Sequence, residues 1–260
     1  MTPFAALHHA GPPLLLPNAW DHASALALAG LGFPAIGTTS LAVAAAAGLP
    51  DGESATRDET LRLALVLGSQ PFLLSVDAED GFSEDPDEVG EFARRLAAVG
   101  AVGVNLEDAL GPADRHAAKI SAVKRAAPGL FVNARTDTYW LGRKADEGER
   151  WRETLTRLDV YQQAGADGVF VPGLTDPARI ADLAARLDAP LNVLFSPAGP
   201  TVPRLAGLGV RRVSLGSLLY RRALGAALEA VTEIRAGRAP EGRTPSYGEV
   251  QTLGTPDPPE

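Results

Sequence analysis

The chain of 260 residues has no cysteine and only four histidines. Without cysteine it can form no disulfide, no thiolate nucleophile, no iron–sulfur cluster and no cysteine-bound zinc site. The histidines show neither the H-x-x-x-H nor the H-E-x-x-H spacing of a histidine metal site, and we expect His116 on a helix surface. These absences exclude cysteine chemistry and give no sign of a zinc site.

The sequence also lacks a basic stripe, and its formal net charge is −8. We expect no nucleic-acid partner, because a phosphate backbone would be repelled. The run LAVAAAAGLP is too short and too broken to span a bilayer, and no secretion signal is recognisable. We therefore expect a cytoplasmic protein with no membrane partner, in which a local arginine or metal can still attract an anionic substrate.

Short β-rich runs alternate with helical segments along most of the chain. The predicted strands cover 13–17, 34–38, 71–77, 101–107, 130–135, 167–172, 190–195 and 210–216. Proline or glycine marks nearly every junction between a strand and a helix. Eight such units predict an α/β fold, a (β/α)8 TIM barrel. The alternative is an open doubly wound sheet, but no G-x-G-x-x-G turn follows the first strand.

The barrel is predicted to occupy residues 1–236 as a single domain, since apolar residues make up 45% of the chain and can form a sizeable core. A short helix is expected in the first ten residues, and a long last helix over 217–236. Residues 237–260 are polar and rich in proline and glycine. We expect them to form a tail that packs on the barrel or a neighbouring subunit, or is partly disordered.

Carboxylates and one arginine stand where the middle strands end. Asp77 and Glu79 follow the third strand, Glu107 ends the fourth, and Arg135 ends the fifth. A barrel builds its active site at this end of its strands, and strand alternation puts Asp77 and Glu79 on the same side. Three carboxylates at close range raise one another's pKa unless a cation is present. Oxygen ligands favour Mg²⁺, or Mn²⁺, over Zn²⁺, and Arg135 suits a substrate carboxylate.

Other polar and aromatic residues have simpler interpretations. Four acids, Glu84, Asp85, Asp87 and Glu88, are expected to open the next helix and to favour its dipole. Asp108 is expected to be solvated or to cap a helix. We expect the three tryptophans to serve packing rather than ligand binding; they are Trp20, Trp140 and Trp151.

Seven motifs span nearly the whole chain: LPNAWDHASA, AIGTTSLAVAAAAGLPDGE, SVDAEDGF, GAVGVNLED, VNARTD, GADGVFVPGL and GVRRVSLGSLLYRRAL. Together they resemble the isocitrate lyase/phosphoenolpyruvate mutase superfamily, in its phosphonomutase-like branch. The resemblance implies a barrel whose last helix is swapped between subunits, hence a homodimer or homotetramer. It also implies Mg²⁺ and a small 2-oxo or 2-hydroxy carboxylic acid as substrate.

The resemblance also assigns roles to individual acids. Asp77 matches the acid nearest the metal, and Glu79 and Glu107 match acids that hold the metal largely through water. Asp51, in the motif GLPDGE, matches a further acid near the site.

On the substrate side, Thr39 and Ser40 match positions that contact the substrate carboxylate. Arg135 matches the arginine that grips the substrate. The chain departs from the family in several respects: it has no K-x-C-G-H loop with a catalytic cysteine, only the short stretch DALGPADRH, without a lysine, follows Glu107, and Glu79 stands where Asp is usual.

The sequence thus predicts a Mg²⁺-dependent lyase, isocitrate or methylisocitrate lyase-like, which forms or cleaves a carbon–carbon bond adjacent to a 2-oxo acid. Arg135 and Glu107 are the expected catalytic residues. Either Glu107 or a metal-bound water is the base, and solvent is one candidate for the acid. Two alternatives stay open: P–C chemistry on phosphonopyruvate, by a mutase or a hydrolase, and 2-oxo acid binding without turnover.

Overall fold

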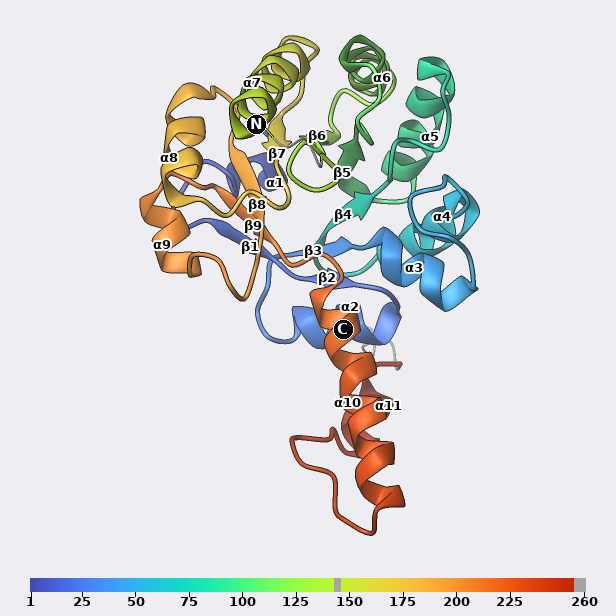
Figure 1. Cartoon of the computed structure of the whole chain (residues 1–260). Helices are drawn as coiled ribbons and strands as arrows, with labels where there is room; N and C mark the ends of the chain where they lie inside the picture. The colour runs from blue at the N-terminus through green and yellow to red at the C-terminus, as the bar shows by residue number, and fades with distance from the viewer. Residues whose placement is uncertain (143–145, 255–260) are drawn as a thin grey trace.

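The computed structural model describes residues 1–142 and 146–254, in which nine parallel strands form one sheet ringed by helices (Figure 1). The strand order is β1-β9-β8-β7-β6-β5-β4-β3-β2. Only Pro17 separates β1 (Leu14–Leu16) from β2 (Asn18–Ala19); β1 pairs with β9 and β2 with β3. Proline has no N–H for a ladder, so one strand is interrupted there and its two halves join the ends of the sheet. The predicted TIM barrel is confirmed.

The remaining strands each lie within a range predicted from the sequence. They are β3 (Ala35–Thr38), β4 (Leu73–Asp77), β5 (Ala101–Glu107), β6 (Phe131–Arg135), β7 (Gly168–Phe170), β8 (Leu191–Leu194) and β9 (Arg212–Ser214). Several are buried on both faces, as expected for parallel strands covered by helices.

Helices lie between the strands along the chain, with α1 before β1 and with α10 and α11 after β9. They are α1 (Pro3–Ala6), α2 (His22–Ala29), α3 (Ser40–Ala47), α4 (Arg57–Leu67), α5 (Pro86–Ala98), α6 (Ala113–Ala126), α7 (Glu147–Gln163), α8 (Pro177–Arg186), α9 (Val202–Gly207), α10 (Leu218–Arg235) and α11 (Tyr247–Thr252). The acids before α5 behave as predicted: Asp85 caps the helix by accepting a hydrogen bond from the Asp87 N–H, and Asp87 and Glu88 lie in its first turn.

The N-terminal end of the barrel is closed by α1. The Phe4 ring is fully buried and meets the Phe131 ring edge-on at 5.4 Å, while the ring of His8 stacks on Phe131 at 4.3 Å. Position 103 must be glycine for this plug to fit, because a Cβ there would lie 2.6 Å from Phe4 Cε1. Ligand access is therefore left to the opposite end of the strands.

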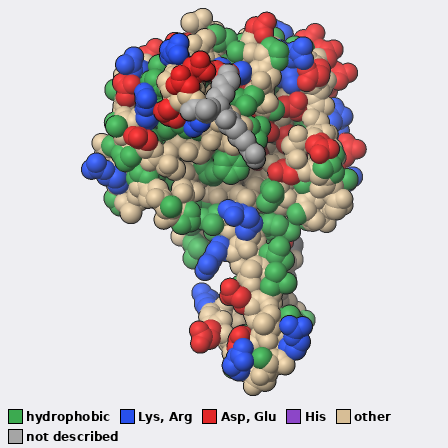
Figure 2. Space-filling model, in the orientation of Figure 1, with side chains coloured by type: hydrophobic (Ala, Val, Ile, Leu, Met, Phe, Trp, Pro, Cys, Tyr) green, Lys and Arg blue, Asp and Glu red, His purple; other side chains and the backbone are tan. Residues whose placement is uncertain are grey.

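The last long helix, α10, extends away from the barrel (Figure 1) and buries none of its residues within the chain. Four of its large apolar side chains are exposed, and Figure 2 shows hydrophobic side chains along part of this arm. They are Leu224, Leu228, Val231 and Ile234. In the described part of the chain, no helix combines the length and the apolar character needed to cross a membrane.

Candidate active site

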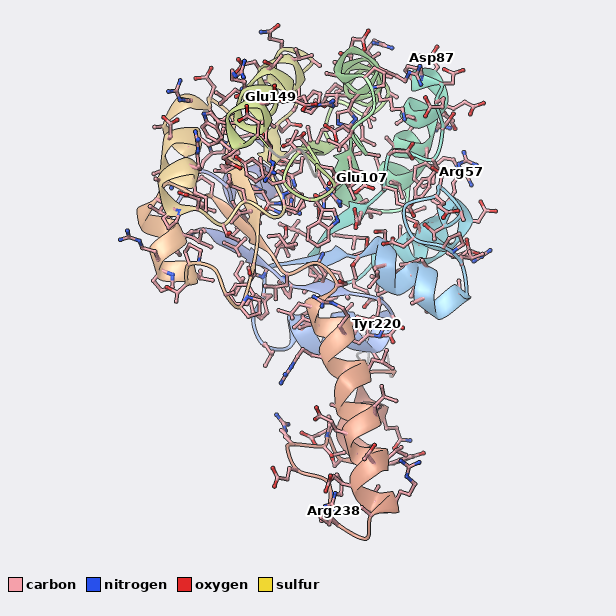
Figure 3. All side chains as sticks on the ribbon, viewed as in Figure 1. Arg57, Asp87, Glu107, Glu149, Tyr220 and Arg238 are labelled. Carbon is pink, nitrogen blue, oxygen red and sulfur yellow. The ribbon has the colours of Figure 1, made fainter. Side chains whose placement is uncertain are left out.

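A cavity of about 320 Å³ opens at the C-terminal ends of the strands. Six of the seven site residues predicted from the sequence line it: Thr39, Ser40, Asp51, Asp77, Glu107 and Arg135. Figure 3 shows Glu107 toward the centre of the ring of elements, whereas Asp87 lies on the outside of α5. The seventh residue, Glu79, lies outside the cavity lining. The barrel therefore gathers most of the predicted site into one space.

Asp77 ends β4 and is held by the neighbouring strand and helix. Its backbone N–H donates a hydrogen bond to Thr38 Oγ1 at 2.9 Å. Its Oδ2 accepts a hydrogen bond from the backbone N–H of Ser40 at 3.0 Å. Ser40 is the first residue of α3, and a helix N-terminus favours a negative charge. The carboxylate of Asp77 is therefore fixed at the mouth of the cavity.

Glu107 and Arg135 form an ion pair across adjacent strands, where they are register partners. Glu107 Oε2 lies 2.5 Å from Arg135 Nη1, and Arg135 Nε lies 2.7 Å from Asp137 Oδ1. The pKa of Glu107 is raised to about 8, first by burial and then by the charges of Asp77, Asp137 and Glu79, while the charge of Arg135 works against the rise. Burial works to lower the pKa of Arg135, but the charges of Glu107 and Asp137 raise it overall. Arg135 thus stays charged, and Glu107 can hold or release a proton near neutral pH.

Glu79 is turned toward a loop. Because β4 ends at Asp77 and Glu79 has a φ of 47°, the strand alternation expected through Glu79 stops before it. Its Oε2 accepts a hydrogen bond from the Ser54 N–H at 3.0 Å, and its Oε1 accepts one from the Thr56 hydroxyl at 2.5 Å. The pKa of Glu79 is raised by burial, against these hydrogen bonds, and further by Asp51 and Asp77.

The donor set of the site suits a hard divalent cation. Among the described residues, no three His, Asp or Glu side chains are grouped as direct ligands of one ion. The negative charge of Asp77 nonetheless contributes to the raised pKa values of Asp51, Glu79 and Glu107, each of which is raised first by burial. A cation held by oxygen ligands beside Asp77 would relieve this repulsion, with the other acids reaching it through water.

Sequence reasoning missed a second set of charged groups beside this site. Asp108 was expected to be solvated or to cap a helix, but it is only 6% exposed. Its Oδ1 accepts hydrogen bonds from the N–H groups of Leu110 and Asp137, and its Oδ2 accepts them from Arg157 and Tyr161. Arg157 and Tyr161 come from α7, far along the chain, so only the folded structure brings them to Asp108.

Two other expectations are wrong. His116 is 3% exposed, because α6 packs against α7 and the His116 ring meets Tyr161 edge-on at 4.6 Å. Trp140 is 55% exposed and lines the cavity instead of packing in the protein. The other two tryptophans do pack: Trp151 is 8% exposed, and Trp20 meets Tyr220 edge-on at 5.5 Å.

An acid-and-arginine site at the C-terminal end of a closed barrel defines a TIM-barrel enzyme site. The chain matches the family model described as phosphoenolpyruvate phosphomutase over residues 4–235. It therefore belongs to this family, within the isocitrate lyase/phosphoenolpyruvate mutase superfamily, and the resemblance seen in the sequence is confirmed.

Comparisons with individual proteins agree. An uncharacterized protein of Mycobacterium tuberculosis is 44% identical over 95% of this chain and 94% of that protein. The 2-methylisocitrate lyase of Bacillus subtilis is 32% identical over 76% of this chain and 68% of that enzyme. A crystal structure from Burkholderia cenocepacia, assigned as a lyase or mutase, has a TM-score of 0.86 at 35% identity and covers 98% of this chain and 95% of that one. A phosphonopyruvate hydrolase crystallised with oxalate and Mg²⁺ shares the fold, with a TM-score of 0.82 at 23% identity, over 96% of this chain and 93% of that one.

Proposed function

We propose that this protein is a Mg²⁺-dependent lyase that forms or cleaves a carbon–carbon bond adjacent to a 2-oxo acid. The observation that carries the proposal is the grouping of Asp77, Glu107 and Arg135 around one cavity at the strand ends. The 2-methylisocitrate lyase relative supports this reaction class, and the Mg²⁺ and oxalate of the phosphonopyruvate hydrolase structure support the metal and the ligand class.

Some polar residues of the cavity bind the substrate carboxylate in this proposal, and others bind the metal ion. Arg135 binds the carboxylate of the acid, and Thr39 and Ser40 contact it from the start of α3. Asp77 would hold Mg²⁺, or Mn²⁺ in its place, and Glu107 and the more distant Glu79 would hold it through water, with Asp51 nearby. When bound, the cation supplies positive charge beside the developing oxyanion.

The proton transfer falls to Glu107. A general base works best when its pKa lies near the working pH, and burial raises the pKa of Glu107 to about 8. The adjacent guanidinium of Arg135 fixes the orientation of the carboxyl group. Solvent entering the open side of the cavity serves as the acid.

The test is a turnover panel with Mg²⁺: isocitrate, 2-methylisocitrate, oxaloacetate, an alkyl-substituted malate and phosphonopyruvate. We expect Mg²⁺-dependent carbon–carbon cleavage of at least one acid, abolished by EDTA. Turnover of phosphonopyruvate alone would replace the proposal by P–C chemistry. Mg²⁺-dependent binding of 2-oxo acids without turnover of any of them would leave a binding protein.

We also propose that α10 mediates a homodimer or homotetramer by exchange between subunits. Leu224, Leu228, Val231 and Ile234 repeat at helical spacing and lie 51 to 62% exposed, which suits burial against a second copy. In this proposal residues 1–236 form one domain and the tail 237–260 packs on it or on the neighbour; its residues 255–260 lie outside the described structure. The change Leu228→Glu should dissociate the oligomer in light scattering; an unchanged mass would contradict the role of α10.

A further inference from the structure

The cavity has two chemically different walls, which come from different strands. The charged wall contains Asp77, Glu107 and Arg135, at the ends of β4, β5 and β6. The apolar wall comes from the turn after β6 and from the ends of β7 and β8. Six apolar residues line that part: Trp140, Leu141, Phe170, Pro172, Leu194 and Phe195. Because β7 and β8 follow β6 in the ring, the apolar residues lie on neighbouring elements, and we call them the apolar wall.

The apolar wall is built before any ligand arrives. The turn that carries Trp140 and Leu141 is held by hydrogen bonds from both backbone N–H groups to the carbonyl of Asp137, at 3.0 and 2.8 Å. The turn after β7 packs on it so closely that a Cβ at Gly173, which has a φ of 83°, would lie 2.5 Å from the Tyr139 carbonyl oxygen. The wall therefore needs little ordering when it meets a ligand.

Two of these side chains leave apolar surface uncovered. Trp140 is 55% exposed and Leu141 is 49% exposed, although both face a cavity of about 320 Å³. Apolar surface in a concave site, beside a few convergent polar groups, is typical of a ligand pocket. The apolar part of a bound ligand would cover it.

The cationic groups lie elsewhere. Among the described residues that line the cavity, the cationic side chains are Arg135 and Arg221. Arg135 already pairs with Glu107 and Asp137, and Arg221 is an exposed residue of α10 that donates a hydrogen bond to Ser217 Oγ at 3.2 Å. The Arg135 guanidinium lies 6.0 Å from the centre of the Phe170 ring, at the edge of the apolar wall, and binds the first carboxylate in the proposed function. Arg221 lies outside the wall, so the described wall offers no further charged partner for a second carboxylate.

We propose that the cavity selects a 2-oxo or 2-hydroxy acid whose chain, beyond the reacting carbons, ends in a branched alkyl or aryl group. The carboxylate lies at Arg135, and the apolar group lies against Phe170, Leu194 and Trp140. This inference rests on the proposed function, because it takes the charged wall as the site of the oxo acid. It adds that the part of the substrate remote from the carboxylate is apolar, which the reaction class does not specify.

The decisive comparison uses two probes of nearly equal shape, 5-methyl-2-oxohexanoate and 2-oxoglutarate, measured by calorimetry with Mg²⁺. An isopropyl group in one replaces a carboxylate in the other. We expect the branched acid to bind about tenfold or more tightly, since each buried methylene contributes roughly three- to fourfold. Equal binding, or tighter binding of 2-oxoglutarate, would overturn the inference.

Pyruvate separates this inference from the proposed function. If pyruvate binds only with Mg²⁺ but 2-oxoglutarate is preferred over the branched acid, the oxo-acid site stands and the apolar end is wrong. If none of the three acids shows Mg²⁺-dependent binding, the proposed function fails, and the inference fails with it.

Variants of the wall give an independent readout. Leu194→Arg places a cation on the apolar wall at a partly buried position and should reverse the preference toward 2-oxoglutarate. The matched control is Leu65→Arg, at a leucine of α4 that is 63% exposed and remote from the cavity; it should leave the preference unchanged. If Leu194→Arg does not fold, Trp140→Ala serves instead, because Trp140 is largely exposed. It should weaken the branched acid about tenfold more than pyruvate; an equal loss would contradict the assignment of Trp140 to the far end.

Discussion

Glu107 and Asp108 are neighbours in the chain, yet they stand in opposite surroundings. Glu107 lines the cavity beside Arg135, and burial raises its pKa to about 8. Asp108 points the other way and accepts four hydrogen bonds, two from backbone N–H groups and one each from Arg157 and Tyr161. Burial alone would raise the pKa of Asp108, but these partners lower it overall. A carboxylate with filled hydrogen-bonding capacity stabilises the fold, whereas one buried among like charges is prepared for proton transfer.

The backbone produces this separation. Consecutive residues of a strand point to opposite sides, so the side chains of Glu107 and Asp108 diverge as β5 ends. The chain then turns through Ala109 and Leu110, which have φ values of 43° and 59°. The two sides remain connected, because Asp137 bonds Arg135 through its side chain and Asp108 through its backbone N–H.

The largest effect is expected from Asp108→Ala. It removes the buried carboxylate that accepts hydrogen bonds from Arg157, Tyr161 and two backbone N–H groups, and among the described residues it leaves Arg157 paired with Glu153 alone. The free energy of unfolding should therefore fall by about 3–5 kcal/mol. Urea denaturation monitored by circular dichroism measures this loss. The control is Asp87→Ala, at an exposed side chain, which should change stability by less than about 0.5 kcal/mol. Equal stability of the two variants would contradict a structural role for Asp108.

Glu107→Gln should show the reverse behaviour. Turnover should fall about 10²–10³-fold, because the proton acceptor is lost. The free energy of unfolding should stay within about 1 kcal/mol of the parent, since the amide has nearly the shape of the neutral carboxyl and Arg135 keeps its ion pair with Asp137. Kinetics and denaturation on the same preparation measure both quantities. Full turnover by this variant would exclude Glu107 as the base.

His116 extends the comparison to pH. Burial lowers its pKa to about 4, below the ordinary 6.5, so the unfolded chain binds a proton that the folded chain does not. Stability is therefore lost as pH falls from 6.5 toward 4, and this group should account for about 2 kcal/mol between pH 7 and pH 5. His116→Phe should remove that part of the slope in urea denaturation at the two pH values. An unchanged slope would show that His116 is not the group responsible.

Tyr161→Phe should give the smallest change. It removes one hydroxyl hydrogen bond to Asp108 of 2.7 Å and keeps the ring that packs on His116. We expect a loss of about 1.5 kcal/mol in unfolding free energy, by the same denaturation measurement, because the other donors remain. A loss as large as that of Asp108→Ala would mean that the hydroxyl, and not the ion pair, holds the cluster together.

Local patterns were enough to predict the strands and the site face. The apolar run that ends in Glu107 has the bounds of β5, and the acids after β4 and β5 identify the catalytic end of the barrel. The length and the end of a strand depend largely on residues that are close together in the sequence, so the sequence alone can predict them.

The contacts that the sequence did not predict join residues that are far apart in the chain. Arg157 lies 49 residues from Asp108, and nothing local indicates that α7 brings it there. The positive φ of Glu79 and the exposure of Trp140 depend on how two loops meet the barrel. Buried polar pairs between segments far apart in the sequence were therefore missed, while the residues that line the cavity from the strand ends were predicted.

Calorimetric titration of pyruvate into the wild-type protein and into Asp77→Ala, each with and without Mg²⁺, tests the central claim most directly. We expect binding by the wild type that requires Mg²⁺, and a loss of about 100-fold or more in Asp77→Ala, because in the proposed function Asp77 holds the cation beside the substrate. Binding that is unchanged in Asp77→Ala, or that ignores Mg²⁺ in the wild type, would contradict it.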